Sequence, residues 1–189
     1  MSPAHSLPRV APRPPRDPFT EILSLPRTLV VIDSTRFRVK DRYYRVPGLV
    51  PVAPRRICTD RDGARWACGL ASRVALRTLV AGRHLACLPG PEDPGDEETA
   101  VAGGAASAEV LLLCRVDATR HLAEELLRLG AARLAEGSDG TLYGAPDDDA
   151  AAQNVKNAPD PVRLRQIEAE AQAAGAGLWR AVEEDGGRP

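Results

Sequence analysis

The order of the apolar segments constrains the fold of this chain more than any other feature of its sequence. The segment at residues 28–33 has the sequence T-L-V-V-I-D, a run of aliphatic and β-branched residues typical of a buried strand. Ser34 and Thr35 then supply a turn, and the strand pattern resumes at Phe37 and Val39. The sequence therefore predicts that the domain opens with a meander of β-strands.

A helix is predicted over residues 63–80, and Gly82 is its expected stop. Trp66, Leu70 and Val74 are spaced by four residues, so they share one face of this helix. We expect that face to be buried against the strands.

The remaining predicted elements are strands at residues 84–88 and 109–116 and helices at residues 119–129 and 160–174. Leu122, Leu126 and Leu129 are the expected inner stripe of the first of these two helices.

Capping residues fix the ends of both predicted helices. Asp117 or Thr119 is the expected cap of the first helix, and Gly130 is its expected stop. Asp160 is the expected N-cap of the second helix, with Pro161 at its first position.

Four segments lack the periodicity of a packed element, and they leave one domain over residues 28–182. We predict a flexible arm rich in proline and arginine, two disordered loops and a flexible tail, at residues 1–27, 89–107, 137–158 and 183–189.

The net charge of -1 conceals an asymmetry along the chain. Residues 1–88 carry 16 basic and 6 acidic residues, whereas residues 89–189 carry 9 basic and 20 acidic residues. The basic half could attract phosphate or an acidic partner, or the two halves could neutralise each other in the fold. Aromatic residues make up only 4% of the chain, so a large aromatic ligand cavity is not expected.

Cysteine usage and the chain's N-terminal sequence bear on its location. The four cysteines form no CxxC pair, so a zinc site is not expected. Four buried free thiols are the expectation, and two disulfides are the alternative in an oxidising compartment (Cys58, Cys68, Cys87 and Cys114). The chain has no apolar stretch long enough to span a membrane, and its first residues lack the apolar core of a signal peptide. The sequence as written favours the cytoplasm, and the periplasm is the alternative if the true start lies upstream.

Four stretches in the same order resemble one known family. Residues 58–82 have the sequence C-T-D-R-D-G-A-R-W-A-C-G-L-A-S-R-V-A-L-R-T-L-V-A-G, and residues 31–39 have V-I-D-S-T-R-F-R-V. The stretch H-L-A-E-E-L-L-R-L-G-A-A and the last helix followed by G-L-W complete the set. Together they resemble the thermonuclease family, the staphylococcal-nuclease-like domains of bacteria. This resemblance implies an α+β fold, an OB-type five-stranded barrel with three helices.

The family hydrolyses nucleic-acid phosphodiesters with Ca²⁺, which requires carboxylate ligands, a carboxylate base and two arginines. The resemblance places these groups on Thr35, Val50, Ala53 and Glu109, which all have the wrong chemistry, and on Arg45, which is retained. Moreover, no Asp or Glu occurs between residues 41 and 60. We therefore expect the domain to lack hydrolytic activity and to need no metal or other cofactor.

Three functions remain open at this point. The leading hypothesis is a catalytically inactive interaction module that binds an unidentified protein partner. One alternative is binding of nucleic acid through the basic half, with candidate residues Arg36, Arg38, Arg42, Arg45, Arg55 and Arg56 beside Tyr43 and Tyr44. The other is a residual calcium-dependent nuclease. An accessory role in an exopolysaccharide pathway, after which some similar proteins are named, has no residue here that tests it.

Other candidate sites have ordinary structural explanations. His5, His84 and His121 are isolated and show no metal-ligand spacing. The acidic run at residues 147–149 is expected to be solvated loop charge, although it could hold a cation weakly.

Overall fold

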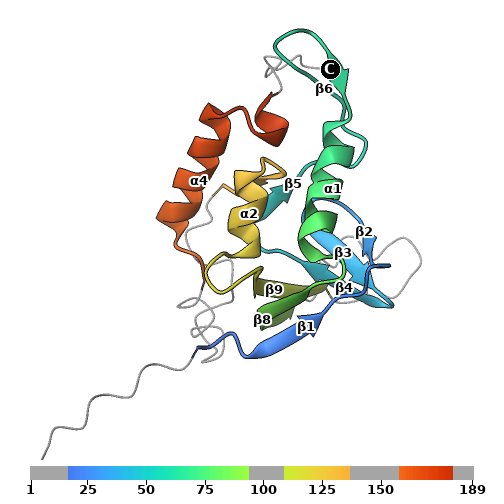
Figure 1. The fold of residues 1–189 in the computed structure, drawn as a ribbon, viewed down its shortest axis with the longest axis vertical. Helices are drawn as coiled ribbons and strands as arrows, with labels where there is room; N and C mark the ends of the chain where they lie inside the picture. Colours follow the sequence, from blue (N-terminus) through green and yellow to red (C-terminus); the bar gives the residue numbers. More distant parts are fainter. Residues whose placement is uncertain (1–16, 94–108, 137–157, 181–189) are drawn as a thin grey trace, which may run out of the picture.

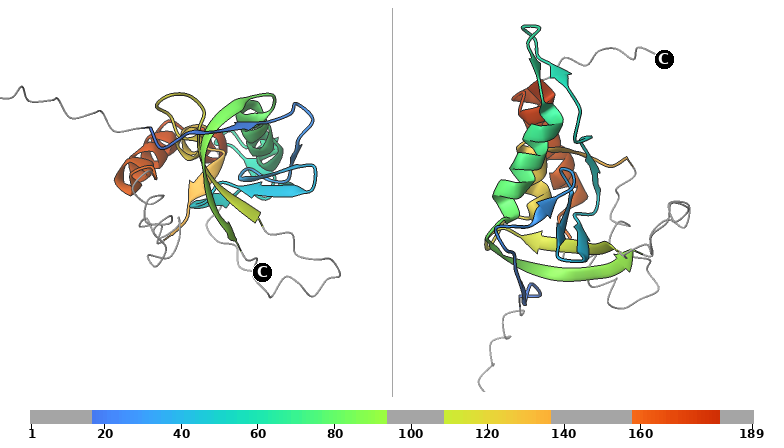
Figure 2. Two further views of the ribbon diagram at one scale, coloured as in Figure 1. Left: turned by 90° about the horizontal axis from the view of Figure 1, so that it is seen from below. Right: turned by 90° about the vertical axis from the view of Figure 1, so that its right-hand side faces the viewer.

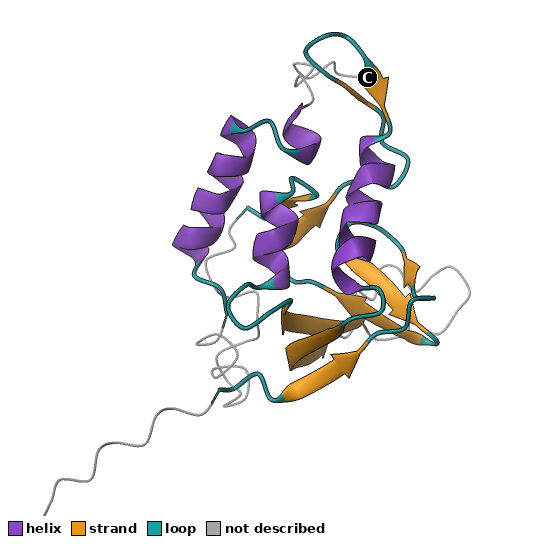
Figure 3. Ribbon diagram, in the orientation of Figure 1, coloured by secondary structure: helices purple, strands orange, loops and turns teal. Residues whose placement is uncertain are grey.

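The computed structural model describes residues 17–93, 109–136 and 158–180 (Figure 1). These residues form a mixed α+β fold with one six-stranded sheet, two short two-stranded sheets and three α-helices (Figure 3). The helix α2 lies between α4 and α1, and the large sheet lies across one end of the three (Figures 1 and 2).

The large sheet has the strand order β1-β8-β9-β4-β3-β2. Its strands are β1 (Glu21–Ser24), β2 (Val30–Val31), β3 (Arg36–Val39), β4 (Arg42–Arg45), β8 (His84–Asp93) and β9 (Glu109–Arg115). All neighbours are antiparallel except β4 and β9, which are parallel. Because β1 and β2 are the two edges, no ladder between them closes the sheet into a barrel.

One face of the sheet, here called the inner face, carries the core. Val31, Phe37 and Tyr44 share this face by register, and the rings of Phe37 and Tyr44 stack with their centroids 5.3 Å apart. Leu76 of α1 and Leu126 of α2 are fully buried against the same cluster. The opposite, outer face carries the alternate side chains of the same strands.

The helix α1 (Cys68–Val80) begins five residues later than predicted. The hairpin of β6 (Cys58–Thr59) and β7 (Arg65–Trp66) precedes it. Gly63, at φ +79°, lies in the turn of this hairpin. Residues 63–67 thus belong to a local hairpin whose two-residue strands are too short to show a periodic sequence signal.

The buried face of α1 is also different from the predicted one. Cys68, Ser72 and Leu76 point into the core, whereas Leu70 and Val74 are 54% and 52% exposed. Both stripes have a spacing of four residues, so the spacing alone could not choose between them. The choice is made by packing, because Gly69 lies directly against the backbone at residues 53–54.

The helix α2 (Leu122–Arg128) confirms the predicted burial of Leu122 and Leu126, but Leu129 is 45% exposed because the helix has already ended there. Asp117 caps the turn before the helix rather than the helix itself, since its Oδ1 accepts from the amides of residues 119 and 120. Gly130 follows the helix at φ +58°, as predicted.

The last long helix, α4 (Pro161–Ala173), confirms the predicted capping. The Asp160 side chain accepts a hydrogen bond from the amide of Val162, and proline occupies the first helical position. A 3₁₀ helix, η3 (Gly177–Arg180), follows. The strands β5 (Leu49–Pro51) and β10 (Ala132–Leu134) pair beside these helices.

The segment predicted as a flexible arm partly belongs to the sheet. Residues 21–24 form β1, which pairs with β8, and Phe19 is buried on the outer face beside Leu113. The predicted loop at 89–107 likewise begins too early, because β8 continues to residue 93. The rest of that loop, residues 1–16, the loop at 137–157 and the tail lie outside the described residues.

All four cysteines are oxidised, so the expectation of free thiols was wrong and the disulfide alternative holds. Cys58 is bonded to Cys68, which ties the β6–β7 hairpin to the start of α1. Cys87 is bonded to Cys114, its register partner across β8 and β9. Within the described ranges, no helix is both long and apolar enough to cross a membrane.

Candidate functional site

Three of the five positions inferred from the family resemblance come together in the structure. Thr35 lies in the turn between β2 and β3, Arg45 ends β4, and Glu109 begins β9. Arg36 is directly opposite Arg45, and the β4–β9 ladder places Glu109 two residues along the same face. Residues distant in the chain thus form one cluster on the outer face of the sheet.

Asp33 organises the turn of this cluster. Its Oδ1 accepts hydrogen bonds from the amides of Thr35 and Arg36 and from the Thr35 hydroxyl, at 2.8, 2.9 and 3.0 Å. Its Oδ2 accepts from Arg36 Nε at 2.6 Å. The Asp33 side chain is buried, and its two oxygens accept hydrogen bonds from four donors of the protein itself.

Glu109 occupies the space between two arginines. Its carboxylate oxygens lie 3.6 Å from an Arg36 Nη and 3.7 Å from Arg45 Nε. Burial alone would lower the pKa of Arg36, but its contacts with Asp33 and Glu109 outweigh burial and raise that pKa. The two arginines and two carboxylates balance in formal charge, so a phosphate group at the arginines would compete with Glu109.

The segment of Val50 and Ala53 lies beside the same turn. The amide of Val52 donates to Ser34 Oγ at 2.9 Å, which holds the chain after β5 against residues 33–35. The side chain of Val50 is exposed, and neither it nor Ala53 carries an oxygen. Within the described ranges, no three His, Cys, Asp or Glu residues are grouped so as to hold a metal ion.

The six candidate arginines do not form one surface. Arg36, Arg38 and Arg45 share the outer face, where Arg38 lies over the Tyr43 ring at 5.8 Å from its centroid. The register places Arg42 on the opposite face. Arg55 and Arg56 are exposed in the loop after β5.

The isolated histidines have structural roles where they are described. His84 Nδ1 is 2.9 Å from Ser24 Oγ, and the His121 ring packs edge-on against Phe19. His5 and the acidic run at 147–149 lie outside the described residues.

Sequence reasoning missed a surface on α1, here called the α1 outer face (Ile57, Leu70, Arg73, Val74 and Arg77). Ile57 is half exposed and adjoins the start of the helix, since Gly69 N donates to the carbonyl of Arg56. On a helical projection, Leu70 and Val74 lie at the centre of the solvent side, with Arg77 beside them.

The two arginines of this face are held by backbone carbonyls and not by carboxylates. Arg73 donates to the carbonyl of Val31 at 2.7 Å, and Arg77 donates to those of Leu29 and Arg27 at 3.2 and 3.0 Å. Across the described segments, neither arginine forms an ion pair. One sequence signal could have pointed here, because residues 63–91 contain no Asp or Glu.

No protein-family model matches this chain, and no curated protein matches it. A function therefore has to be inferred from its own residues.

Proposed function

We propose that this chain is a catalytically inactive, nuclease-like domain that works as a protein-interaction module. On this proposal the open six-stranded sheet corresponds to the five-stranded OB-type barrel of the thermonuclease family, left unclosed between β1 and β2. The three helices in their order along the chain, and the turn at Asp33 beside Arg45, support that correspondence.

The cluster around Asp33 supports the loss of catalysis. Hydrolysis with Ca²⁺ needs carboxylate oxygens that are open to the ion and a carboxylate that activates water. Both carboxylate oxygens of Asp33 already accept hydrogen bonds from protein donors, four in all. Glu109 neutralises the arginines that would hold phosphate. Losing one such charge contact typically costs about 10²–10³ in rate, and here several are absent together.

We propose the α1 outer face as the docking surface. Its combination of exposed apolar residues and arginines is the observation that supports an interaction function. Half-exposed Leu70 and Val74 can bury apolar area against a partner, at about 25 cal/mol per Å². Arg73 and Arg77 flank them with no carboxylate on the helix, so the matching partner is a protein with an acidic rim around an apolar patch.

The test compares two surface variants for binding to one isolated partner. Leu70→Ser/Val74→Ser alters the α1 outer face, and Val162→Ser is the matched control because it replaces an exposed valine on α4. Nuclease-treated extract is crosslinked to the wild-type chain, and the captured protein is purified and titrated against all three chains.

The proposal predicts at least tenfold weaker binding for the double variant, unchanged binding for the control and weaker wild-type binding at high salt. Equal affinity for all three chains would overturn the proposed surface. A protein that is captured from untreated extract but not from nuclease-treated extract would overturn the protein-partner function itself.

Nucleic-acid binding is a second candidate, favoured by Arg38 against the Tyr43 ring on the outer face. Single-stranded DNA should then bind with an affinity that falls steeply with salt, and more tightly to Glu109→Gln, which releases the anion competitor. Absent or salt-insensitive binding would dismiss this candidate.

A further inference from the structure

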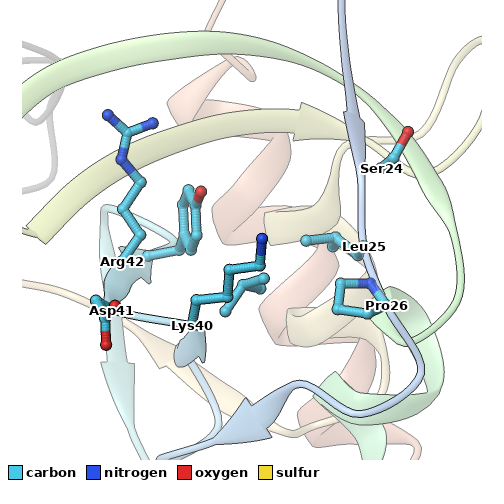
Figure 4. Close-up of a pocket in the computed structure, with 8 residues that line it drawn as sticks. Ser24, Leu25, Pro26, Lys40, Asp41 and Arg42 are labelled. Atoms are coloured by element: carbon cyan, nitrogen blue, oxygen red, sulfur yellow. The ribbon is translucent and has the colours of Figure 1, made fainter.

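A cavity of about 730 Å³ lies between the chain leaving β1 and the tip of the β3–β4 hairpin (Figure 4). Its lining residues are Ser24, Leu25, Pro26, Val39, Lys40, Asp41, Arg42 and Tyr44. Its volume lies within the roughly 300–1,000 Å³ range of small-molecule sites.

The apolar wall of the cavity is preformed. Leu25 and Tyr44 are buried members of the core, and the Tyr44 ring is fixed by its stacking on Phe37. Pro26 and Val39 complete this wall. Because Leu25 and Tyr44 are buried, an apolar molecule would lie mainly against exposed Pro26 and half-buried Val39.

The polar rim of the cavity is cationic. Lys40 and Arg42 form no ion pair within the described part of the chain. Figure 4 shows the Lys40 nitrogen extending towards Leu25 and Pro26, while the Asp41 carboxylate points away from them. A negative group entering here would meet Lys40 before it met any carboxylate.

The hairpin turn sets the direction of the Lys40 side chain. Lys40 and Asp41 are the two loop residues between the register partners Val39 and Arg42, and Lys40 has φ +54°. A two-residue hairpin loop requires a positive φ of this kind. In this turn the Lys40 side chain extends towards Leu25 and Pro26 (Figure 4).

We propose that this cavity binds small amphiphilic anions, with a carboxylate, sulfonate or phosphate at Lys40 and an aliphatic or aromatic body against Leu25, Pro26 and Val39. The Arg42 guanidinium points away from Lys40 in Figure 4, so it contributes positive charge at the rim and not a second direct contact. The proposal does not rest on the interaction-module function, because the α1 outer face shares no residue with the cavity.

The first test titrates the full chain with 1-anilinonaphthalene-8-sulfonate, followed by fluorescence, and displaces the probe with octanoate. The test variants are Lys40→Asn, whose side chain tolerates the left-handed turn, and Arg42→Gln. Lys40→Arg keeps the charge, and Arg83→Gln is a matched control at an exposed site outside the cavity. Circular dichroism verifies that each variant is folded.

We expect Lys40→Asn/Arg42→Gln to weaken probe and octanoate binding at least tenfold, and Lys40→Arg and Arg83→Gln to stay within about threefold of wild type. Affinity should rise with each added methylene of the carboxylate, by up to fourfold. Octanol should bind much more weakly than octanoate. Equal binding of the wild type and Lys40→Asn/Arg42→Gln, or equal binding of octanol and octanoate, would overturn the proposal.

A second arm distinguishes a dissolved anion from a lipid headgroup. Vesicles of phosphatidylglycerol and of phosphatidylcholine are sedimented with the wild type and with Lys40→Asn. Binding of monomeric octanoate identifies a dissolved anion as the ligand. Binding to the anionic vesicles but not to octanoate, with loss of that binding in Lys40→Asn, identifies a lipid headgroup. Failure with both sources would reject the site and leave the interaction-module function untouched.

Discussion

At the residue scale, Asp33 holds Thr35 in the turn between β2 and β3. The Thr35 hydroxyl donates to Asp33 Oδ1 in a buried site, and its amide donates to the same oxygen. An aspartate at this position would place a second carboxylate against Asp33 in place of a hydrogen-bond donor.

Replacing Thr35 with aspartate is expected to destabilise the protein by about 2–3 kcal/mol, because a second carboxylate is buried against Asp33. Urea unfolding at pH 7.5 measures the change, and Thr20→Asp at an exposed position is the control. A wild-type free energy of unfolding in Thr35→Asp would mean that the turn is not packed as described.

His121 predicts a pH dependence at the residue scale. Burial lowers its pKa below 6.5; Glu124 partly opposes this effect, and Arg115 adds to it. The unfolded chain therefore binds the proton more readily, so His121 contributes stability that is complete above pH 6.5 and is lost as the pH falls below it. The ring of Phe19 packs against the imidazole and fixes it in place.

Accordingly, His121→Gln is expected to flatten the change in unfolding free energy between pH 7.5 and pH 5.5. Arg83→Gln, at an exposed position, provides the control variant, which should behave as wild type. Urea titrations at both pH values decide the matter, and an unchanged pH dependence in His121→Gln would contradict this assignment.

At the scale of elements, the sequence predicted the features that depend on neighbouring residues and missed those that depend on residues distant in the chain. The start of α4 was predicted because Asp160 and Pro161 act within one turn. The strand β1 was missed because it is only four residues long and because its partner β8 begins sixty residues after β1 ends. The buried face of α1 was wrong because tertiary contact at Gly69, not periodicity, sets it.

Gly69 therefore gives an element-scale prediction. A Cβ at this residue would lie 2.0 Å from the carbonyl oxygen of Ala53, so Gly69→Ala must push apart two backbone segments. We expect a loss of about 2–3 kcal/mol, despite the better helix propensity of alanine. Gly63→Ala, in open space but at φ +79°, should cost only about 1 kcal/mol. Thermal unfolding compares them, and equal costs would contradict the close approach.

The candidate site was predictable in part for similar reasons. The family resemblance assigned Arg45 and Glu109 to site positions without predicting a contact between them, and the structure places their side chains together. The cavity at Lys40 had no sequence signal, and the α1 outer face had only the absence of Asp and Glu from residues 63–91. Both depend on which apolar side chains packing leaves exposed and on a turn conformation that lysine rarely adopts.

At the scale of the whole molecule, one disulfide joins the paired strands β8 and β9, and the other joins the β6–β7 hairpin to the start of α1. The Cys87–Cys114 bond closes a loop with a sequence separation of 27, and the Cys58–Cys68 bond one of 10. Loop-closure entropy assigns them about 3.5 and 3 kcal/mol. Disulfides persist in oxidising compartments, so we propose that the chain works in one, such as the periplasm.

Replacing Cys87 and Cys114 together with alanine is therefore expected to lower the free energy of unfolding by more than the same change at Cys58 and Cys68. Urea unfolding of the oxidised proteins measures both losses. Treating the wild type with a thiol reductant should produce a larger loss than either pair alone. A reduced wild type as stable as the oxidised protein would remove the argument for an oxidising compartment.

The proposed absence of catalysis is tested most directly by incubating the protein at high concentration with single-stranded DNA, with Ca²⁺ or with EDTA. The closed cluster of Asp33, Arg36, Arg45 and Glu109 predicts no cleavage above buffer in either condition. Cleavage that requires Ca²⁺, stops with EDTA and is lost in Arg45→Gln would contradict that prediction.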